Sequence, residues 1–498
     1  MSVRVGVAAL LLLGGVLYAQ DDLHEEIKYT LRSDMTLQYS QLPHEVDTLG
    51  EMFTQGILYG RLRFNSFGFK WGEELSKGDV PIRKDNAIAA IGGSLLYRSG
   101  VLNGVWFGGG LYATTSAGNL EREESYLYKS GKDAFSRYDR LKDGTVGILT
   151  LAQGYLAYTH AETTLKAGRQ IFESFLTKSN DSKMIPNTFE GVTLDSKVLP
   201  QTDIKAAYLT RQKLRDHSTF HHLFAYGYNP DEPYSAYSQN DDSSMHIGLT
   251  LDKLEAAGID DRLVVLDVHN HSVENLALWG NYTLVPDLIS YAMIEADYGF
   301  DLGSWRVVPG IRYMQQSDEG AAAIIGPNAA SRRLLTTGYK NPQSLDASMF
   351  GARIDLKHER LKLRLGYTDV ADKADMITPW RGFPTSGFTR VMGQNNWYAN
   401  TKSYMLQVKY DTGFFDDLSL MGRFAYQDFD DSKPGVQADS NVLTLDVMKG
   451  FGSKSHLYAK MRYGHVWGED DTPIAGSPGK FKLDPSYDEI RFEINYLF

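Results

Sequence analysis

The feature that most constrains the fold is an alternation of apolar and polar residues, repeated in segments of about ten residues between clusters of turn-forming residues. Successive side chains of a β-strand point to opposite faces, so in segment 362–365 both leucines share one face and Lys362 and Arg364 the other. Segment 457–463 likewise has an apolar face and a face that carries Lys460 and Arg462. The pattern predicts many amphipathic strands.

These strands are better suited to a membrane than to a soluble core. A soluble sheet could bury its apolar side, but many such strands without covering helices favour lipid outside and water inside. Closure into a barrel also removes unpaired strand edges. With about 25 residues per strand and its connections, the chain would form roughly 16 to 20 strands. We therefore predict an all-β fold, a transmembrane antiparallel β-barrel wide enough for an aqueous channel.

The N-terminal region predicts export. Arg4 precedes the apolar run 5–16, and we expect cleavage after Ala19, as in a secretory signal peptide. The run is short of the roughly twenty residues that span a bilayer as a helix. We expect residues 1–19 to be the signal peptide, residues 20–51 a periplasmic lead-in, and residues 52–498 the barrel, with the first strand starting near Met52.

The C-terminal segment shows the alternation most clearly. Ile490, Phe492, Ile494, Tyr496 and Phe498 alternate with Arg491, Glu493, Asn495 and Leu497. An aromatic final residue after such a strand resembles the signal read by the outer-membrane assembly machinery, although a soluble protein could also end on a strand. The 30 tyrosines and 7 tryptophans suit the two membrane interfaces. These observations predict the outer membrane of a Gram-negative bacterium.

The more polar strand faces carry many basic residues. Assigning the apolar faces to lipid places in the lumen Arg61, Arg63, Arg306, Arg312, Arg353, Lys362, Arg364, Lys409, Arg423, Lys460, Arg462 and Arg491. Fewer acids share these faces, namely Glu295, Asp297, Asp355, Asp446 and Glu493. A column of guanidinium groups could pass carboxylates along the wall, and we call this set the basic ladder. Alternatively, these residues only pair with acids of the loops.

Two segments have the composition of ordered loops that could fold into the barrel and narrow it. Segment 178–191 contributes Asp181, Lys183, Pro186, Phe189 and Glu190, and segment 379–390 contributes Trp380, Arg381, Phe383 and Arg390. Both mix proline, glycine, charged and aromatic residues. Composition does not fix direction, so an outward cap over the barrel mouth is the alternative.

Several segments together resemble the OprD family of outer-membrane porins, especially its branch in campylobacter-like bacteria. The resemblance covers most of the chain after the signal peptide and is carried by segments 167–170, 185–191, 379–385 and 396–402. It implies a barrel of about eighteen strands, pinched by inward-folded loops, with a basic ladder in its wall. It also implies passive diffusion of small hydrophilic solutes, with selectivity for those that bear a carboxylate. The barrel itself would contact outer-membrane lipid and lipopolysaccharide.

Other functions have weaker support in the sequence. A barrel enzyme could use His269 and His271 with Glu274, but their spacing matches no catalytic motif. His217, His221 and His222 lack partners at a recognisable ligand spacing, and the chain has no cysteine, so we predict neither metal nor cofactor. The net charge of −11 argues against nucleic acid. A soluble all-β binding protein and a surface receptor or adhesin remain alternatives.

Overall fold

The computed structural model describes residues 29–31, 37–39, 41, 43–240, 248–330, 337–412, 418–451 and 456–498. The expected signal peptide, residues 1–19, lies outside this part of the chain.

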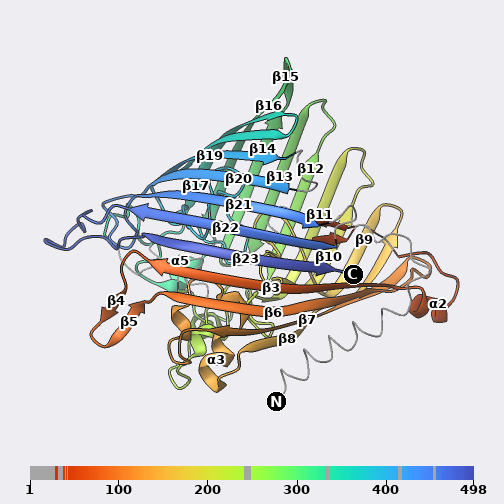
Figure 1. Cartoon of the computed structure of the whole chain (residues 1–498), viewed down its shortest axis with the longest axis horizontal. Helices are drawn as coiled ribbons and strands as arrows, with labels where there is room; N and C mark the ends of the chain where they lie inside the picture. Colours follow the sequence, from red (N-terminus) through yellow and green to blue (C-terminus); the bar gives the residue numbers. More distant parts are fainter. Residues whose placement is uncertain are drawn as a thin grey trace.

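Antiparallel strands close into one barrel (Figure 1). The barrel has nineteen hydrogen-bonded segments, of which β14 and β15 form one strand interrupted at Gly299, so the described residues form eighteen strands. This confirms the predicted fold. The strands are β3 (Ile57–Trp71), β6 (Asn86–Arg98), β7 (Val105–Gly118), β8 (Gly147–His160), β9 (Thr163–Gln170), β10 (Thr188–Ser196), β11 (Thr202–Lys213), β12 (Leu263–Asn270), β13 (Leu276–Val285), β14 (Ile289–Tyr298) with β15 (Phe300–Leu302), β16 (Trp305–Asp318), β17 (Ala347–His358), β18 (Leu361–Val370), β19 (Thr401–Asp411), β20 (Leu418–Asp428), β21 (Ser440–Phe451), β22 (Leu457–Gly468) and β23 (Tyr487–Leu497).

The last strand closes the barrel against the first. In Figure 1 the blue strand β23 lies beside the orange strand β3, and Glu493 is the register partner of Asn65. The seam continues to the final residue, because Gly60 N donates to Phe498 O at 2.6 Å and Phe498 N donates to Gly60 O at 3.0 Å. Closure leaves neither strand with an unpaired edge.

Connections of different length divide the barrel into two ends. Short turns such as 161–162 and 359–360 lie at the end that holds Phe498, which we call the short-turn end. Most connections at the opposite, long-loop end are longer, including 119–146, 171–187, 214–262, 319–346 and 371–400. Small elements outside the barrel are β1 (Tyr29–Leu31), β2 (Leu37–Tyr39), α2 (Leu49–Thr54), β4 (Leu75–Lys77), β5 (Val80–Arg83), η1 (Ser125–Leu127), η2 (Lys132–Ala134), α3 (Arg137–Asp143), η3 (Ser235–Tyr237), α4 (Leu251–Ala257) and α5 (Ala321–Ile325).

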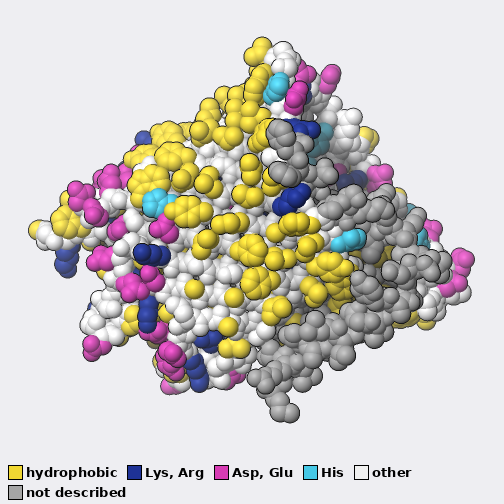
Figure 2. Space-filling view, viewed as in Figure 1, with side chains coloured by type: hydrophobic (Ala, Val, Ile, Leu, Met, Phe, Trp, Pro, Cys, Tyr) yellow, Lys and Arg dark blue, Asp and Glu magenta, His cyan; other side chains and the backbone are white. Residues whose placement is uncertain are grey.

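The outer surface is apolar, and the inner surface is polar where strands alternate. On β23, Ile490 is 48% exposed, whereas the neighbouring inward residues Glu493 and Asn495 are 2% and 0% exposed. Figure 2 shows hydrophobic side chains spread over the strands of one face, with many charged side chains at the long-loop end. Within the described residues, the structure contains no helix long and apolar enough to cross a membrane.

Two expected boundaries differ from the structure. The first strand does not begin near Met52, because Leu49–Thr54 form helix α2 and β3 begins at Ile57. The helix is stabilised by a capping box, in which Glu51 N donates to Thr48 Oγ1 at 3.2 Å while the Glu51 carboxylate accepts from the Thr48 backbone N. The loop expected over 178–191 ends at Asn187, so Phe189 and Glu190 belong to strand β10.

Candidate functional site

The connection 171–187, which we call loop A, enters the barrel from the long-loop end. Its Asp181 lies 3.2 Å from Arg61 and 2.5 Å from Arg63, two inward-facing residues of β3. The backbone oxygen of Lys183 accepts a hydrogen bond from Asn65 at 2.7 Å. Loop A therefore lies against the inner wall of β3, and Pro186 accepts through its backbone oxygen from buried Lys213 at 3.0 Å.

The connection 371–400, loop B, is joined to loop A inside the barrel. Lys178 N donates to Trp380 O at 3.1 Å, and Gly382 N donates to the backbone oxygen of Leu176 at 2.8 Å. A Cβ atom at Gly382 would lie only 2.3 Å from the backbone of Leu176, so glycine permits this close approach. Asn180 Nδ2 of loop A also donates to Arg381 O of loop B at 2.6 Å, across a separation of 201 residues. The two loops, far apart in the sequence, are thus hydrogen-bonded to each other inside the barrel.

Aromatic side chains anchor loop B. Trp380 is fully buried, and its Nε1 donates to Leu223 O at 2.9 Å while its ring stacks against Phe224 with centroids 5.9 Å apart. Phe383 stacks on Trp397 at 5.5 Å, and the guanidinium of Arg390 lies 3.4 Å from the Phe383 ring centroid. Such contacts indicate an ordered loop rather than a loose one.

Three arginines predicted for the lumen lie on β16, β17 and β18 and are paired with acids of the wall. Arg312 donates to Glu295 at 2.7 Å, and Arg364 donates to Asp355 at 2.5 Å. Arg353 bridges Glu295 at 2.8 Å and Asp297 at 2.6 Å. Loop B supplies further acceptors, because Arg312 donates to Pro384 O at 2.8 Å and Arg364 to Gly387 O at 2.7 Å.

The wall of β20, β21 and β22 has more cations than acids. Arg423, Lys460 and Arg462 all face Asp446, at 3.1, 3.5 and 2.6 Å. Asp446 thus lies among three positive side chains of these strands, and Glu493 of the neighbouring strand β23 is the register partner of Lys460. Beside it, Arg491 lies 2.7 Å from Glu489. We call Arg423, Lys460, Arg462 and Asp446 the basic sector.

The remaining predicted cations lie near the short-turn end. Lys362 pairs in register with Lys357 on β17 and with Lys409 on β19, and Lys409 lies 3.1 Å from Asp411. Arg306 lies beside β15, 3.2 Å from Asp301, with 37% of its side chain exposed. The structure therefore places Arg306 at the rim, apart from the arginines that contact loop B.

The sequence did not reveal a set of buried charges that connects the loops. Asp133 of connection 119–146 contacts Lys183 of loop A and lies 3.4 Å from Arg215. Asp216 accepts from Arg137 at 2.9 Å. Burial alone would raise the pKa of Asp216, but the neighbouring positive groups, Arg137 first and then His217, together outweigh burial and lower this pKa to about 2. No short motif unites these residues, because they come from three separate connections.

The histidines considered for catalysis or metal binding have other contacts. His269 Nε2 lies 2.8 Å from buried Asp267, and its ring stacks on Trp279 at 4.7 Å. Ser272, the neighbouring hydroxyl, donates to Asn270 at 2.7 Å. Among the described residues no group of three or more His, Asp or Glu is arranged to hold a metal ion.

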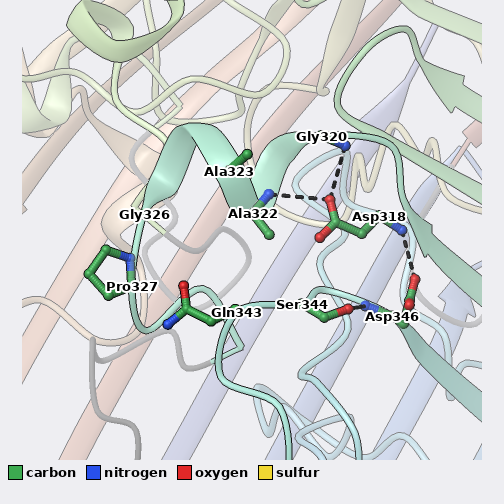
Figure 3. Close-up of a pocket in the computed structure, with 9 residues that line it drawn as sticks. All are labelled: Asp318, Gly320, Ala322, Ala323, Gly326, Pro327, Gln343, Ser344 and Asp346. Carbon is green, nitrogen blue, oxygen red and sulfur yellow. Dashed lines mark hydrogen bonds between the residues drawn. The ribbon is translucent and has the colours of Figure 1, made fainter.

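A surface cavity of about 560 Å³ lies beside α5 at the long-loop end (Figure 3). Its two carboxylates are used within the loops: Asp318 accepts from Gly320 N at 3.0 Å, and Asp346 accepts from Asp318 N at 2.9 Å. These bonds explain the local loop geometry, and we assign the cavity no ligand.

Solved structures share this fold. The vanillate complex of OpdK from Pseudomonas aeruginosa superposes with a TM-score of 0.65 at 14% identity, covering 90% of this chain and 99% of that chain. OccK8 (OprE) from the same species also superposes with a TM-score of 0.65 at 14% identity, covering 90% of this chain and 99% of that chain. OccAB4 from Acinetobacter baumannii gives a TM-score of 0.64 at 13% identity, covering 89% of this chain and 98% of that chain. A comparison with curated protein sequences finds no match.

A family model supports the same assignment from the sequence. The model described as outer membrane porin, OprD family, matches residues 154–420. This confirms the resemblance noted in the sequence. Because the match covers more than half of the 498 residues, the chain belongs to the OprD family of outer membrane porins, which lie in the outer membrane of Gram-negative bacteria and pass small hydrophilic solutes.

Proposed function

We propose that the chain is a passive channel that favours small solutes bearing a carboxylate, and that it catalyses no reaction. The basic sector carries this proposal, because Arg423, Lys460 and Arg462 bring three positive charges together around Asp446, at 3.1, 3.5 and 2.6 Å. Guanidinium groups remain charged at all physiological pH values and offer paired donors to a carboxylate. A solute carboxylate can therefore interact with the sector transiently and continue along the gradient.

Loops A and B are proposed to form the constriction. They meet inside the barrel through the Lys178–Trp380 and Leu176–Gly382 backbone hydrogen bonds, and Asp181 links them to the wall. A constriction next to a charged wall brings each solute within a short distance of those charges, where electrostatic discrimination is strongest. The solved relative OpdK was crystallised with vanillate, a small carboxylate, which is consistent with this class of solute.

The proposal is tested by single-channel recording of the mature chain in planar bilayers under salt gradients of opposite direction. We expect stepwise conductance with anion preference. The double substitution Arg423→Gln with Arg462→Gln should weaken that preference, whereas Lys402→Gln, on the outward face of β19, should leave it unchanged. Arg353→Gln with Arg364→Gln should also weaken it, and should additionally loosen loop B, because both side chains donate to Gly387 O.

Other results would have different meanings. Conductance steps without anion preference would support the channel but contradict the proposal that the basic ladder makes it selective. A correctly folded barrel without conductance would favour the receptor or barrel-enzyme alternative.

We also propose that residues 1–19 are removed on export, that residues 20–51 lie on the periplasmic side, and that Phe498 is read by the assembly machinery. The backbone pairing of Phe498 with Gly60 at the closing seam supports a role for this residue in assembly. Deleting Phe498 should lower the yield of heat-modifiable, membrane-inserted barrel in cells. An unchanged yield would reject this role.

A further inference from the structure

Three arginines lie together on the outward face at the long-loop end. Arg169 of β9 and Arg211 of β11 are both register partners of Glu190 on β10, and Arg262 directly precedes β12. The register shift between Glu190 and Gly191 brings Arg211 to the same side as Glu190, while its neighbour Gln212 remains buried. We call Arg169, Arg211 and Arg262 the rim arginines.

Two of the rim arginines are held in position by neighbours. Arg169 donates to Glu190 at 2.8 Å and lies 4.6 Å from the ring centroid of Phe220. Arg262 donates to Asp260 at 2.6 Å and to the hydroxyl of Tyr208 at 2.7 Å. These contacts orient the guanidinium groups without using all of their five donors.

Arg211 supplies a positive charge without a matching acid. Its side chain is exposed, and within the described residues it has neither an ion pair nor a side-chain hydrogen bond. Arg211 and Arg262 line the same cavity of about 320 Å³, together with Thr210, Phe220, His222 and the carboxylate of Asp260. The cavity therefore offers guanidinium, hydroxyl and imidazole groups beside an aromatic ring.

The outward rim has a different character on the other side of the barrel. There the hydroxyl of Tyr367 donates to Asp369 at 3.2 Å, and the hydroxyl of Tyr463 donates to Asp488 at 2.7 Å. The hydroxyl of Tyr208 instead accepts from a cation, Arg262. Among these tyrosines, Tyr208 in the sector of β9 to β12 thus has a cation as its partner, whereas Tyr367 and Tyr463 have acids.

We propose that the rim arginines bind a phosphate group of lipopolysaccharide, the phosphorylated glycolipid of the outer leaflet. Tyrosines on the outward face mark the level where hydrocarbon meets headgroups, and Tyr208 is 42% exposed at this level. A guanidinium beside this aromatic level meets lipid phosphates and can bind them through two parallel hydrogen bonds. A lipid is favoured over free phosphate because Tyr208 and Phe220 present apolar ring surface beside the same cations.

The test measures binding of bisphosphorylated lipid A to the folded, detergent-solubilised mature chain by native mass spectrometry. We expect binding to the unmodified chain, and roughly tenfold or greater weakening in the double variant Arg211→Gln, Arg262→Gln, as the loss of charged hydrogen bonds predicts. Lys402→Gln, which removes a cation from the outward face of β19, is the matched control and should bind normally. Heat-modifiable migration on gels verifies that each variant is folded.

Two further probes identify the chemistry that is recognised. Lipid A from which both phosphates have been removed should bind as weakly as the double variant does. Equal binding of that lipid, or unchanged binding in the double variant, would overturn the proposal. Competition by inorganic phosphate at the concentration of lipid A would assign the cavity to free anions, and would also overturn it.

Discussion

Asp181 of loop A lies 3.2 Å from Nη1 of Arg61, although the two residues are 120 positions apart. Arg61 is close to the short-turn end, since its register partner on β23 is Leu497. A loop that begins at the opposite end is therefore fixed deep in the barrel by an ion pair with the wall. Arg63 and Glu493, 2.9 Å apart, extend this contact to the closing seam.

Asp181→Asn should release loop A from β3. The substitution leaves Arg61 and Arg63 without one of their acidic partners, and breaking a buried pair in this way costs about 3–5 kcal/mol. We expect larger or noisier single-channel conductance and stronger anion preference. Asp203→Asn is the control, because Asp203 is 45% exposed and pairs with Lys197 away from loop A. Wild-type conductance and selectivity in Asp181→Asn would show that the ion pair does not hold the loop.

Trp380→Ala should loosen loop B. Trp380 is fully buried, and replacing such a side chain with alanine costs about 3–5 kcal/mol. Its neighbour Arg381 is 4% exposed, so trypsin cannot readily reach the following peptide bond in the folded chain. We expect trypsin to cleave the variant after Arg381 under conditions in which the wild type stays intact. Trp467→Ala, a substitution on the outward face, is the control and should also stay intact. Equal resistance of all three would contradict the anchoring role.

The strands were predictable because side-chain alternation is a local property. Parity alone placed Arg423 and Arg462 on the inner face, where both contact Asp446. The helix at Leu49–Thr54 was missed although its cap, Thr48 with Glu51 three residues later, is visible in the sequence.

The partners of the loop residues could not be predicted in the same way. Lys183 contacts Asp133, and Arg137 contacts Asp216 from 79 residues away. Such pairs depend on how separate connections fold together, and no spacing within either segment specifies them. For the same reason composition left the direction of loops A and B open, whereas the Lys178–Trp380 hydrogen bond shows that they meet.

His222 should make the connection 214–262 sensitive to pH. Its hydrogen bond to Asp261, at 2.8 Å, raises the pKa of His222 despite partial burial. Because the folded-state pKa is raised, this contribution is fully present below the ordinary value of about 6.5 and is lost as pH rises through the raised pKa. Asp261 also accepts from Ala225 N at 3.0 Å, so hydrogen exchange of that amide reports the effect.

We expect greater protection of the Ala225 amide in wild type than in His222→Gln at pH 5.5, and a smaller difference at pH 8.5. Comparing the two proteins at each pH removes the intrinsic pH dependence of exchange. A difference that is constant with pH, or that grows as pH rises, would contradict the assigned direction.

Gly366→Ala should displace loop B from the wall. A Cβ atom at Gly366 on β18 would lie 2.1 Å from the backbone oxygen of Phe388, a contact that side-chain rotation cannot relieve. Overpacking of this kind lowers the free energy of unfolding by about 1–3 kcal/mol. If loop B moves away to relieve it, the 2.7 Å hydrogen bond from Arg364 to Gly387 O lengthens. We expect larger conductance with stronger anion preference, because Arg364 then faces water. Gly422→Ala is the control, since its Cβ would meet only Leu445 at 3.7 Å. Equal conductance in the two variants would show that loop B does not limit the channel at Gly366.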